Sequence, residues 1–139
     1  MMYELKNKVA LLTGATEWLG RDMAEALAEN GASVIITSRK LEKAKEAARE
    51  ISDKLGVSAL GLALDVTDPK SVEAATEAAF SWQGHIDILV NNSGGGSGKS
   101  EGNLFERSYE AIDGMIKTNL TGTIYMCKAV GRYMKEQKS

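Results

Sequence analysis

Residues 9–20 read VALLTGATEWLG, a short apolar run that leads through a glycine-containing turn into a helical pattern. The run at 9–13 is apolar on both faces, which is typical of a strand buried in a parallel sheet. In doubly wound α/β folds, the turn after the first strand binds a pyrophosphate at the N-terminus of the next helix. A plain strand-to-helix turn also favours glycine, so this stretch alone leaves both interpretations open.

The alternation of strand and helix patterns continues along the chain. Further apolar runs occur at 33–38, 58–64 and 86–90. Amphipathic helical patterns occur at 19–30, 41–55, 69–83 and 108–135. Asp68 and Pro69 are typical of a helix start, and Gly31 and Gly84 are typical of helix ends. The sequence therefore predicts a single α/β domain over 1–139, with a Rossmann-like, doubly wound parallel sheet in spatial order 3-2-1-4.

The last helical pattern carries an apolar stripe. Its members are Ile116, Leu120, Ile124, Cys127, Val130 and Met134. Their spacing places them on one helix face, so Cys127 is interpreted as a buried packing residue, and so are Met115 and Met126. We expect the chain to form a homo-oligomer, because this stripe and the edge of the fourth strand would otherwise stay uncovered.

Charge and composition argue against several classes of function. The 139 residues carry a net charge of −2 and no strongly basic stretch, which argues against nucleic acid or an anionic membrane as the main partner. One cysteine and one histidine leave no multi-cysteine or paired-histidine metal site. The glycine-rich stretch at 93–102 is expected to be a loop, and Ser93 stands where a Walker phosphate loop needs glycine. Without a signal-peptide pattern or an apolar run of about 18 residues, we expect a soluble cytoplasmic protein.

Polar residues follow the third and fourth apolar runs. Asp65 and Val66 come after the third run, Asn-Asn-Ser-Gly at 91–94 comes after the fourth, and Asn119 lies in the last helical region. Together with the turn at 13–20, these elements resemble the short-chain dehydrogenase/reductase family, in its shorter branch. The resemblance covers essentially the whole chain. It implies an oxidoreductase that passes hydride between a nicotinamide dinucleotide and a small-molecule carbonyl or secondary alcohol.

The resemblance also implies a role for each matching residue. At the turn, the residues expected to contact the cofactor are Thr13, Gly14, Thr16, Trp18, Leu19 and Gly20. Asp65 and Val66 would contact the adenine. Beside the cofactor ribose would lie Asn92, Ser93 and Gly94. Asn91 would tie the central strands together, and Asn119 would be the catalytic asparagine whose backbone holds a water in the proton relay. The plainer alternatives are a turn role for Asp65 and a helix-kink or capping role for Asn119.

The sequence departs from the family pattern in two ways. Trp18 replaces the middle glycine of the turn, which normally lets the backbone approach the pyrophosphate. The family's chemistry also needs a serine and a tyrosine with a lysine four residues later, and none of the four tyrosines here has that lysine. We therefore expect the N-terminal, cofactor-binding portion of a dehydrogenase, truncated before a fifth strand and inactive as this chain. The alternative is a non-catalytic nucleotide-binding or assembly module that is complete at this length.

The residues after the second apolar run bear on the choice of cofactor. An acidic residue there would bind the ribose 2′-hydroxyl of NAD(H), but this chain has Ser38, Arg39 and Lys40. A hydroxyl and a guanidinium suit a 2′-phosphate, although Arg39 and Lys40 are also consistent with a charged helix start. Glu17 points the other way, since many NADP-using relatives carry a basic residue there. The balance favours NADP(H) over NAD(H).

Overall fold

The computed structural model of the chain describes residues 4–95 and 103–138. Four parallel strands form a sheet in the order β3-β2-β1-β4. They are β1 (Val9–Leu12), β2 (Ser33–Ser38), β3 (Ala59–Ala63) and β4 (Ile88–Val90). The predicted Rossmann-like sheet and its strand order are confirmed. Most of the predicted glycine-rich loop, at 96–102, lies outside the described residues.

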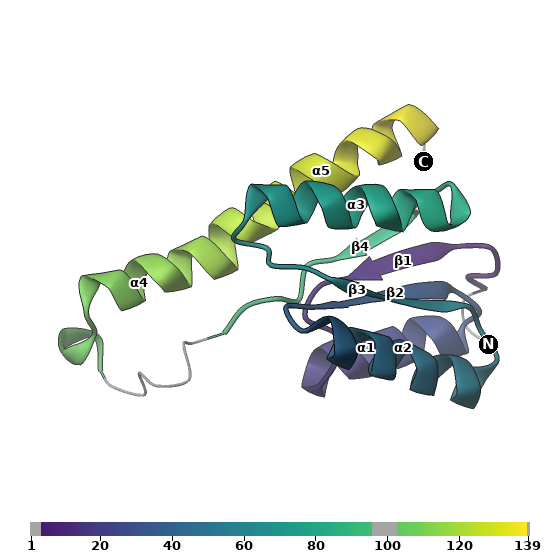
Figure 1. Cartoon of the computed structure of the whole chain (residues 1–139), viewed down its shortest axis with the longest axis horizontal. Coiled ribbons are helices and arrows are strands. Elements are labelled where there is room, and N and C mark those ends of the chain that lie inside the picture. The colour runs from purple at the N-terminus through teal and green to yellow at the C-terminus, as the bar shows by residue number, and fades with distance from the viewer. Residues whose placement is uncertain (1–3, 96–102, 139) are drawn as a thin grey trace.

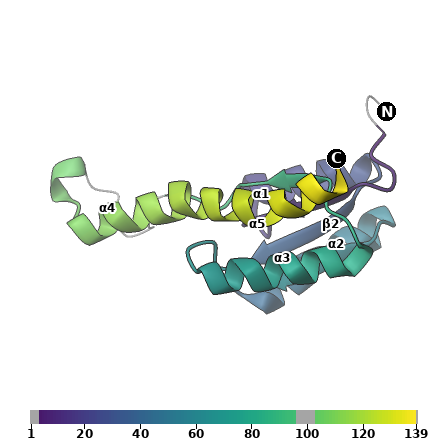
Figure 2. The same ribbon diagram turned by 90° about the horizontal axis from the view of Figure 1, so that it is seen from above.

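Helices cover both faces of the sheet (Figure 1). α1 (Trp18–Glu29) and α2 (Leu41–Leu55) lie on one face, while α3 (Pro69–Gln83) and α5 (Gly122–Gln137) lie on the other. Viewed from above, α3 and α5 run side by side (Figure 2). The carboxyl ends of the four parallel strands therefore meet at one edge of the sheet, which is where this class of fold binds ligands.

Residues that alternate along the strands build two apolar cores. Val9 and Leu11 of β1 belong to the core under α3 and α5. Ala10 and Leu12 point the other way, into the core under α1 and α2. All four residues of β1 are fully buried, as expected for a strand covered on both faces.

The two ends of α3 follow the predicted signals. Asp68 precedes α3, and its Oδ1 accepts a hydrogen bond of 3.1 Å from the N–H of Lys70. Pro69 takes the first helical position, and Gly84 ends the helix with a φ of +79°. The predicted bounds 69–83 of α3 are confirmed, and so are the predicted bounds 41–55 of α2.

Strand β4 is shorter than the predicted run at 86–90. The side-chain amide of Gln137, at the end of α5, accepts from the N–H of Ile86 and donates to its carbonyl oxygen, both at 3.1 Å. A side chain thus satisfies the backbone of Ile86 in place of a neighbouring strand, and the strand begins at Ile88.

The region at 108–135, predicted as one or two helices, is a continuous rod of three segments. α4 (Tyr109–Ile116) is joined to α5 by a π-helical segment, η2 (Lys117–Thr121), where the N–H of Gly122 donates to the carbonyl oxygen of Lys117. This bond spans five residues rather than the four of an α-helix. A short 3-10 helix, η1 (Leu104–Glu106), precedes the rod. α4 extends beyond the sheet, whereas α5 packs on it (Figures 1 and 2).

The predicted apolar stripe is mostly exposed, and the prediction that Cys127 is a buried packing residue was wrong. Val130 is buried, but Cys127, interpreted as a packing residue, is exposed. Three other members of the stripe are more than half exposed: Ile116, Leu120 and Ile124. The buried residues of α5 are Gly122, Met126, Ala129 and Val130. Ile124 precedes Met126 by two residues, about 200° around the helix, so the exposed part of the stripe and the core face point in different directions.

Two features are absent from residues 4–95 and 103–138. No helix in these ranges has the length and apolar character needed to cross a membrane. No group of three or more His, Cys, Asp or Glu residues there is arranged to hold a metal ion.

Candidate functional site: a cavity at the carboxyl ends of the strands

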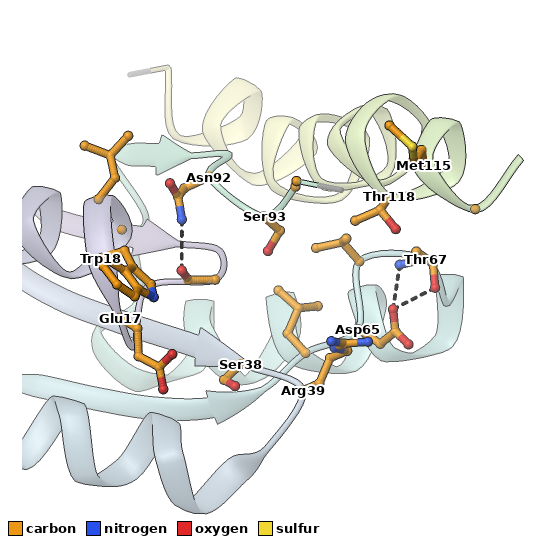
Figure 3. A pocket seen from close by; sticks show the side chains of 18 residues that line it. Glu17, Trp18, Ser38, Arg39, Asp65, Thr67, Asn92, Ser93, Met115 and Thr118 are labelled. Carbon is orange, nitrogen blue, oxygen red and sulfur yellow. Dashed lines mark hydrogen bonds between the residues drawn. The ribbon is translucent and has the colours of Figure 1, made fainter. Parts of the chain in front are cut away.

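A cavity of about 580 Å³ opens at the carboxyl ends of the strands (Figure 3). Its walls come from the segments that follow all four strands, together with α4 and the π-helical segment. The predicted site residues that line it are Gly14, Trp18, Leu19, Gly20, Ser38, Arg39, Asp65, Val66, Asn92, Ser93 and Gly94. Residues far apart in the sequence therefore meet in one space, because parallel strands end at the same edge.

Two glycines shape the turn after β1. Gly14 has a φ of +61°, which a side chain disfavours, and an added Cβ would lie 2.9 Å from the Oγ of Ser93. A Cβ at Gly20 would overlap the side-chain nitrogen of Asn92 and the carbonyl oxygen of Gly14. Asn92 Nδ2 donates to the carbonyl oxygens of Thr13 at 3.2 Å and Gly14 at 2.8 Å. The turn and the segment after β4 thus form one closely packed unit.

The buried Thr13 joins the turn after β1 to the segment after β4. It is 1% exposed, and its Oγ1 accepts hydrogen bonds from the N–H groups of Asn92 at 3.0 Å and Ser93 at 2.9 Å. Thr13 and Thr16, both predicted to contact the cofactor, are not among the described residues that line the cavity. The hydroxyl of Thr13 instead positions residues that do line it.

Trp18 begins α1 at the rim of the cavity. Its φ of +53° is in the left-handed region, which the glycine usual at this position adopts without strain. The side chain is 86% exposed, and Figure 3 shows the indole beside Glu17 at one end of the site. No side chain caps the N-terminus of α1, so the first N–H groups of this helix have no side-chain acceptor. Trp18 therefore borders the cavity without filling it.

The segment after β2 contributes a hydroxyl and a guanidinium. Ser38 and Arg39 both line the cavity, and the Ser38 Oγ accepts a hydrogen bond of 3.2 Å from the N–H of Lys40. Glu17, which also lines the cavity, has its Oε1 2.5 Å from the Nζ of Lys43 in the first turn of α2. The hydrogen bond from Lys43 lowers the pKa of Glu17, so this carboxylate is ionised at neutral pH.

Asp65 follows β3 and is held by Thr67. Its Oδ1 accepts hydrogen bonds from the Thr67 hydroxyl at 2.7 Å and the Thr67 N–H at 2.9 Å. The N–H of Asp65 donates to the Oγ of Ser71 at 2.9 Å. The two bonds from Thr67 lower the pKa of Asp65, and the positive charges of Arg39 and Lys117 add smaller effects. The Asp65 carboxylate is therefore charged and fixed at the cavity wall.

Asn119 lies in the π-helical segment and contacts the chain after β4. Its Oδ1 accepts from the N–H of Gly95 at 2.9 Å, and its Nδ2 donates to the carbonyl oxygens of Gly95 at 3.1 Å and Met115 at 2.9 Å. The carbonyl oxygen of Asn119 accepts from the Thr123 hydroxyl at 3.0 Å. The side chain thus anchors the loop beside the cavity, and the role predicted for the backbone stays a prediction.

Asn91 directly follows β4, and its side chain makes a contact that the sequence did not predict. Its Nδ2 donates to the Sγ of Cys127 at 3.4 Å, which joins β4 to α5. Its Oδ1 is buried and has no hydrogen-bond partner among the described residues. The expected tie between the central strands is therefore absent from this part of the chain.

Sequence reasoning missed several residues of the cavity wall. They are Leu64, Thr67, Gly95, Gly114, Met115 and Thr118, while Glu17, already named for its bearing on the choice of cofactor, also lines the cavity. Met115, interpreted as packing, belongs to the wall together with Thr118, and both lie within one helical turn of Asn119. Met115 stands four residues before Asn119, a spacing that places both on one side of a helix, and this signal could have found Met115. Thr67 carries the weaker signal of an Asx turn, because it stands two residues after Asp65.

Comparison with known proteins places this geometry in a family. The sequence matches the model of the short chain dehydrogenase family over residues 8–139. It is 39% identical over 139 residues to 3-oxoacyl-(acyl-carrier-protein) reductase FabG of Aquifex aeolicus, covering 99% of this chain and 54% of that protein. It is 38% identical over 149 aligned positions to cyclohexanol dehydrogenase of Rhodococcus sp., covering 97% of this chain and 54% of that protein.

A solved structure gives the same result. L-Sorbose reductase from Gluconobacter frateurii, complexed with NADPH and L-sorbose, superposes with a TM-score of 0.89 and 31% sequence identity. The match covers 99% of this chain and 51% of the sorbose reductase chain. The chain belongs to the short-chain dehydrogenase family, which confirms the resemblance found in the sequence. It spans about half the length of the curated relatives it matches.

Proposed function

We propose that this chain is the dinucleotide-binding part of an oxidoreductase that transfers hydride between NADP(H) and a carbonyl or secondary alcohol of a small molecule. The observation that carries the proposal is the shared cavity. The turn after β1, the pair Ser38 and Arg39, and the carboxylate of Asp65 all open onto it. This edge of an open parallel sheet is where nucleotides bind, and the sorbose reductase relative is complexed with NADPH.

The turn after β1 fits a pyrophosphate. Gly14 and Gly20 bring the backbone close to the cavity, and no side chain caps the N-terminus of α1. Free N–H groups and the positive end of a helix dipole favour phosphate oxygens. The N–H groups of Leu19 and Gly20 would hold the two phosphates, and the exposed indole of Trp18 leaves room for them.

The opposite part of the cavity fits the adenosine half. The ionised carboxylate of Asp65 can only accept hydrogen bonds, and the amino group of adenine is a donor. Ser38 and Arg39 would bind the 2′-phosphate through a hydroxyl and a guanidinium fork. No carboxylate stands at these two positions to bind a free 2′-hydroxyl, which favours NADP(H) over NAD(H).

The remaining residues would orient the reactive end of the cofactor. When bound, the cofactor supplies or accepts the hydride. Asn92, Ser93 and Gly94 would border its ribose, and Asn119 would anchor the loop at Gly95 and hold the relay water. None of the four tyrosines has a lysine four residues later, so we assign cofactor binding and orientation, but not proton donation, to these 139 residues.

Equilibrium titration of the purified chain with NADPH and NADH, followed by calorimetry, tests the proposal. We expect saturable binding of NADPH that is weaker in Asp65→Ala. The matched control Asp53→Ala removes an exposed carboxylate from α2, outside the cavity, and should leave binding unchanged. A chain that binds neither dinucleotide contradicts the proposal. NADPH-dependent carbonyl reduction above a heat-inactivated control would contradict the assignment of binding without turnover.

We also propose that the chain self-associates. Ile116, Leu120 and Ile124 form an exposed apolar row along the rod of α4, η2 and α5, called here the outer row. Strand β4 is an edge of the described sheet. Exposed apolar surface and an open strand edge are both stabilised by contact with a second copy.

A further inference from the structure

Glu17 occupies a position that opposes the binding of a 2′-phosphate. It lines the cavity together with Ser38 and Arg39, and Figure 3 shows its side chain next to Ser38. A phosphate held by Ser38 and Arg39 would bring negative charge toward the Glu17 carboxylate. Like charges repel, and the size of this repulsion depends on how well the Glu17 carboxylate is neutralised.

Lys43 neutralises this carboxylate from outside the cavity. Its Nζ lies 2.5 Å from the Oε1 of Glu17, while Lys43 itself is not among the described lining residues. The hydrogen bond between them lowers the pKa of Glu17 and raises the pKa of Lys43, so both groups stay charged at neutral pH. Lys40, which precedes α2, adds a second positive charge that acts on Glu17.

We infer that Glu17 and Lys43 form an exchangeable ion pair that sets the choice of cofactor. When NAD(H) binds, the pair stays closed; when NADP(H) binds, Lys43 leaves Glu17 and pairs with the 2′-phosphate beside Arg39. Lys43 is then a specificity-determining residue, and Glu17 opposes NADP(H). This inference rests on the dinucleotide-binding function proposed above.

The exchange is energetically reasonable. An exposed ion pair contributes little to stability, so opening the Glu17–Lys43 pair costs little. A phosphate monoester carries more charge than a carboxylate and offers three strong acceptor oxygens, so it is the better partner for the Lys43 ammonium. The four-carbon stem of lysine is flexible enough for its ammonium to change partners without a move of α2.

The same helix provides a matched control pair. Glu42 and Lys45 form an ion pair of 3.5 Å on α2, and neither residue is among the described lining residues of the cavity. Glu42→Gln and Lys45→Gln remove the same charges from the same element without touching the proposed site. They therefore separate a local effect at Glu17 and Lys43 from a change in net charge.

The test measures the affinities of NADPH and NADH for the wild-type chain, Glu17→Gln, Lys43→Gln and the double variant. We expect Glu17→Gln to tighten NADPH about 3- to 30-fold, and Lys43→Gln to weaken it by a similar factor, while NADH changes little. The affinity for adenosine 2′,5′-bisphosphate should change across the variants as the affinity for NADPH does. The affinity for adenosine 5′-monophosphate should change as little as that for NADH. The control variants Glu42→Gln and Lys45→Gln should keep the wild-type ratio of NADPH to NADH affinity.

The double variant distinguishes exchange from simple neutralisation. If Lys43 binds the 2′-phosphate, adding Lys43→Gln to Glu17→Gln still weakens NADPH. If Lys43 only neutralises Glu17, Lys43→Gln has no effect in that background, and the inference is overturned. Binding of both dinucleotides with the same affinity ratio in all variants also overturns it, while the proposed function survives. A wild-type chain that binds neither dinucleotide overturns both.

Discussion

The side-chain nitrogen of Asn92 donates a hydrogen bond of 2.8 Å to the carbonyl oxygen of Gly14. A second bond, of 3.2 Å, runs from the same nitrogen to the carbonyl oxygen of Thr13. The turn that we propose to bind the pyrophosphate is thus held in place by a residue that follows a different strand. Its geometry depends on the pairing of β1 with β4 as much as on its own glycines.

Replacing Asn92 with alanine should weaken both the fold and the site. The two lost hydrogen bonds are expected to lower the free energy of unfolding by about 1–2 kcal/mol, measured by urea denaturation, and to reduce NADPH affinity. Asn30→Ala removes one amide bond, to the carbonyl oxygen of Ala26 at the far end of α1, and should leave NADPH affinity unchanged. Wild-type NADPH affinity in Asn92→Ala would show that the turn holds its shape without this residue.

Arg39→Ala should discriminate between the two cofactors. Loss of a charge-assisted contact to the 2′-phosphate is expected to weaken NADPH by roughly 1–3 kcal/mol and to leave NADH nearly unaffected. Arg49→Ala, an exposed arginine of α2 outside the described cavity wall, is the matched control. Calorimetric titration gives both affinities, and equal losses for NADPH and NADH would count against a 2′-phosphate site at Arg39.

The left-handed backbone conformation of Trp18 predicts that its glycine and alanine variants differ in stability. Trp18→Gly should be more stable than Trp18→Ala by about 0.5–1 kcal/mol, because only glycine relieves the φ of +53°, and part of this gain is offset by the freedom of glycine in the unfolded chain. The indole is 86% exposed, so both variants lose little buried surface. Thermal unfolding of the two variants provides the comparison, and an alanine variant as stable as the glycine variant would rule out strain.

The Asp65 carboxylate predicts an acid-sensitive contribution to stability. Its pKa in the folded protein lies below that of an unfolded aspartate, because Thr67 donates two hydrogen bonds to it. This contribution is therefore fully present above the ordinary pKa of an aspartate and is lost as the pH falls through the lower folded value. Thr67→Ala should raise the Asp65 pKa, as measured by carbon NMR of the carboxyl group. An unchanged pKa in this variant would exclude the Thr67 hydroxyl as the main cause.

Self-association should depend on the outer row. Light scattering at micromolar concentration is expected to give a mass above the 14.9 kDa of one chain. Leu120→Lys should reduce that mass, because a charge in the centre of an apolar contact must be desolvated. Leu41→Lys, the same change on α2, should leave it unchanged. A concentration-independent mass near 14.9 kDa for the wild-type chain would refute the proposal.

Local signals explain why much of the fold could be predicted. Strand order followed from the alternation of apolar runs with helices, and the bounds of α3 followed from Asp68, Pro69 and Gly84, which act within a few residues of the chain. Gly14, Asp65 and Asn92 were found through the family resemblance, and each stands two residues after a strand end. Parallel strands bring their ends together whatever the details of packing.

Tertiary contacts explain the errors. The backbone of Ile86, just before β4, is bonded to the side-chain amide of Gln137, which is 51 residues away in sequence. The exposure of Cys127 and the role of Met115 depend on how the last rod is turned against the sheet. The apolar spacing of the stripe suggested that Cys127 is buried, but packing turned Cys127 outward and placed its neighbour Met126 in the core.

The π-helical segment of the rod has a consequence for insertions and deletions. Each residue of an α-helix advances the chain by about 100° around its axis, and the wider turn at 117–121 accommodates an additional residue. Deleting one residue there would restore regular α-helical bonding but rotate the two halves of the rod by about 100° relative to each other. Met126 would then turn out of the core, or Met115 out of the cavity wall. The π-helical segment therefore sets the rotation of α4 relative to α5. Met126 can face the core and Met115 the cavity only while the number of residues at 117–121 stays the same.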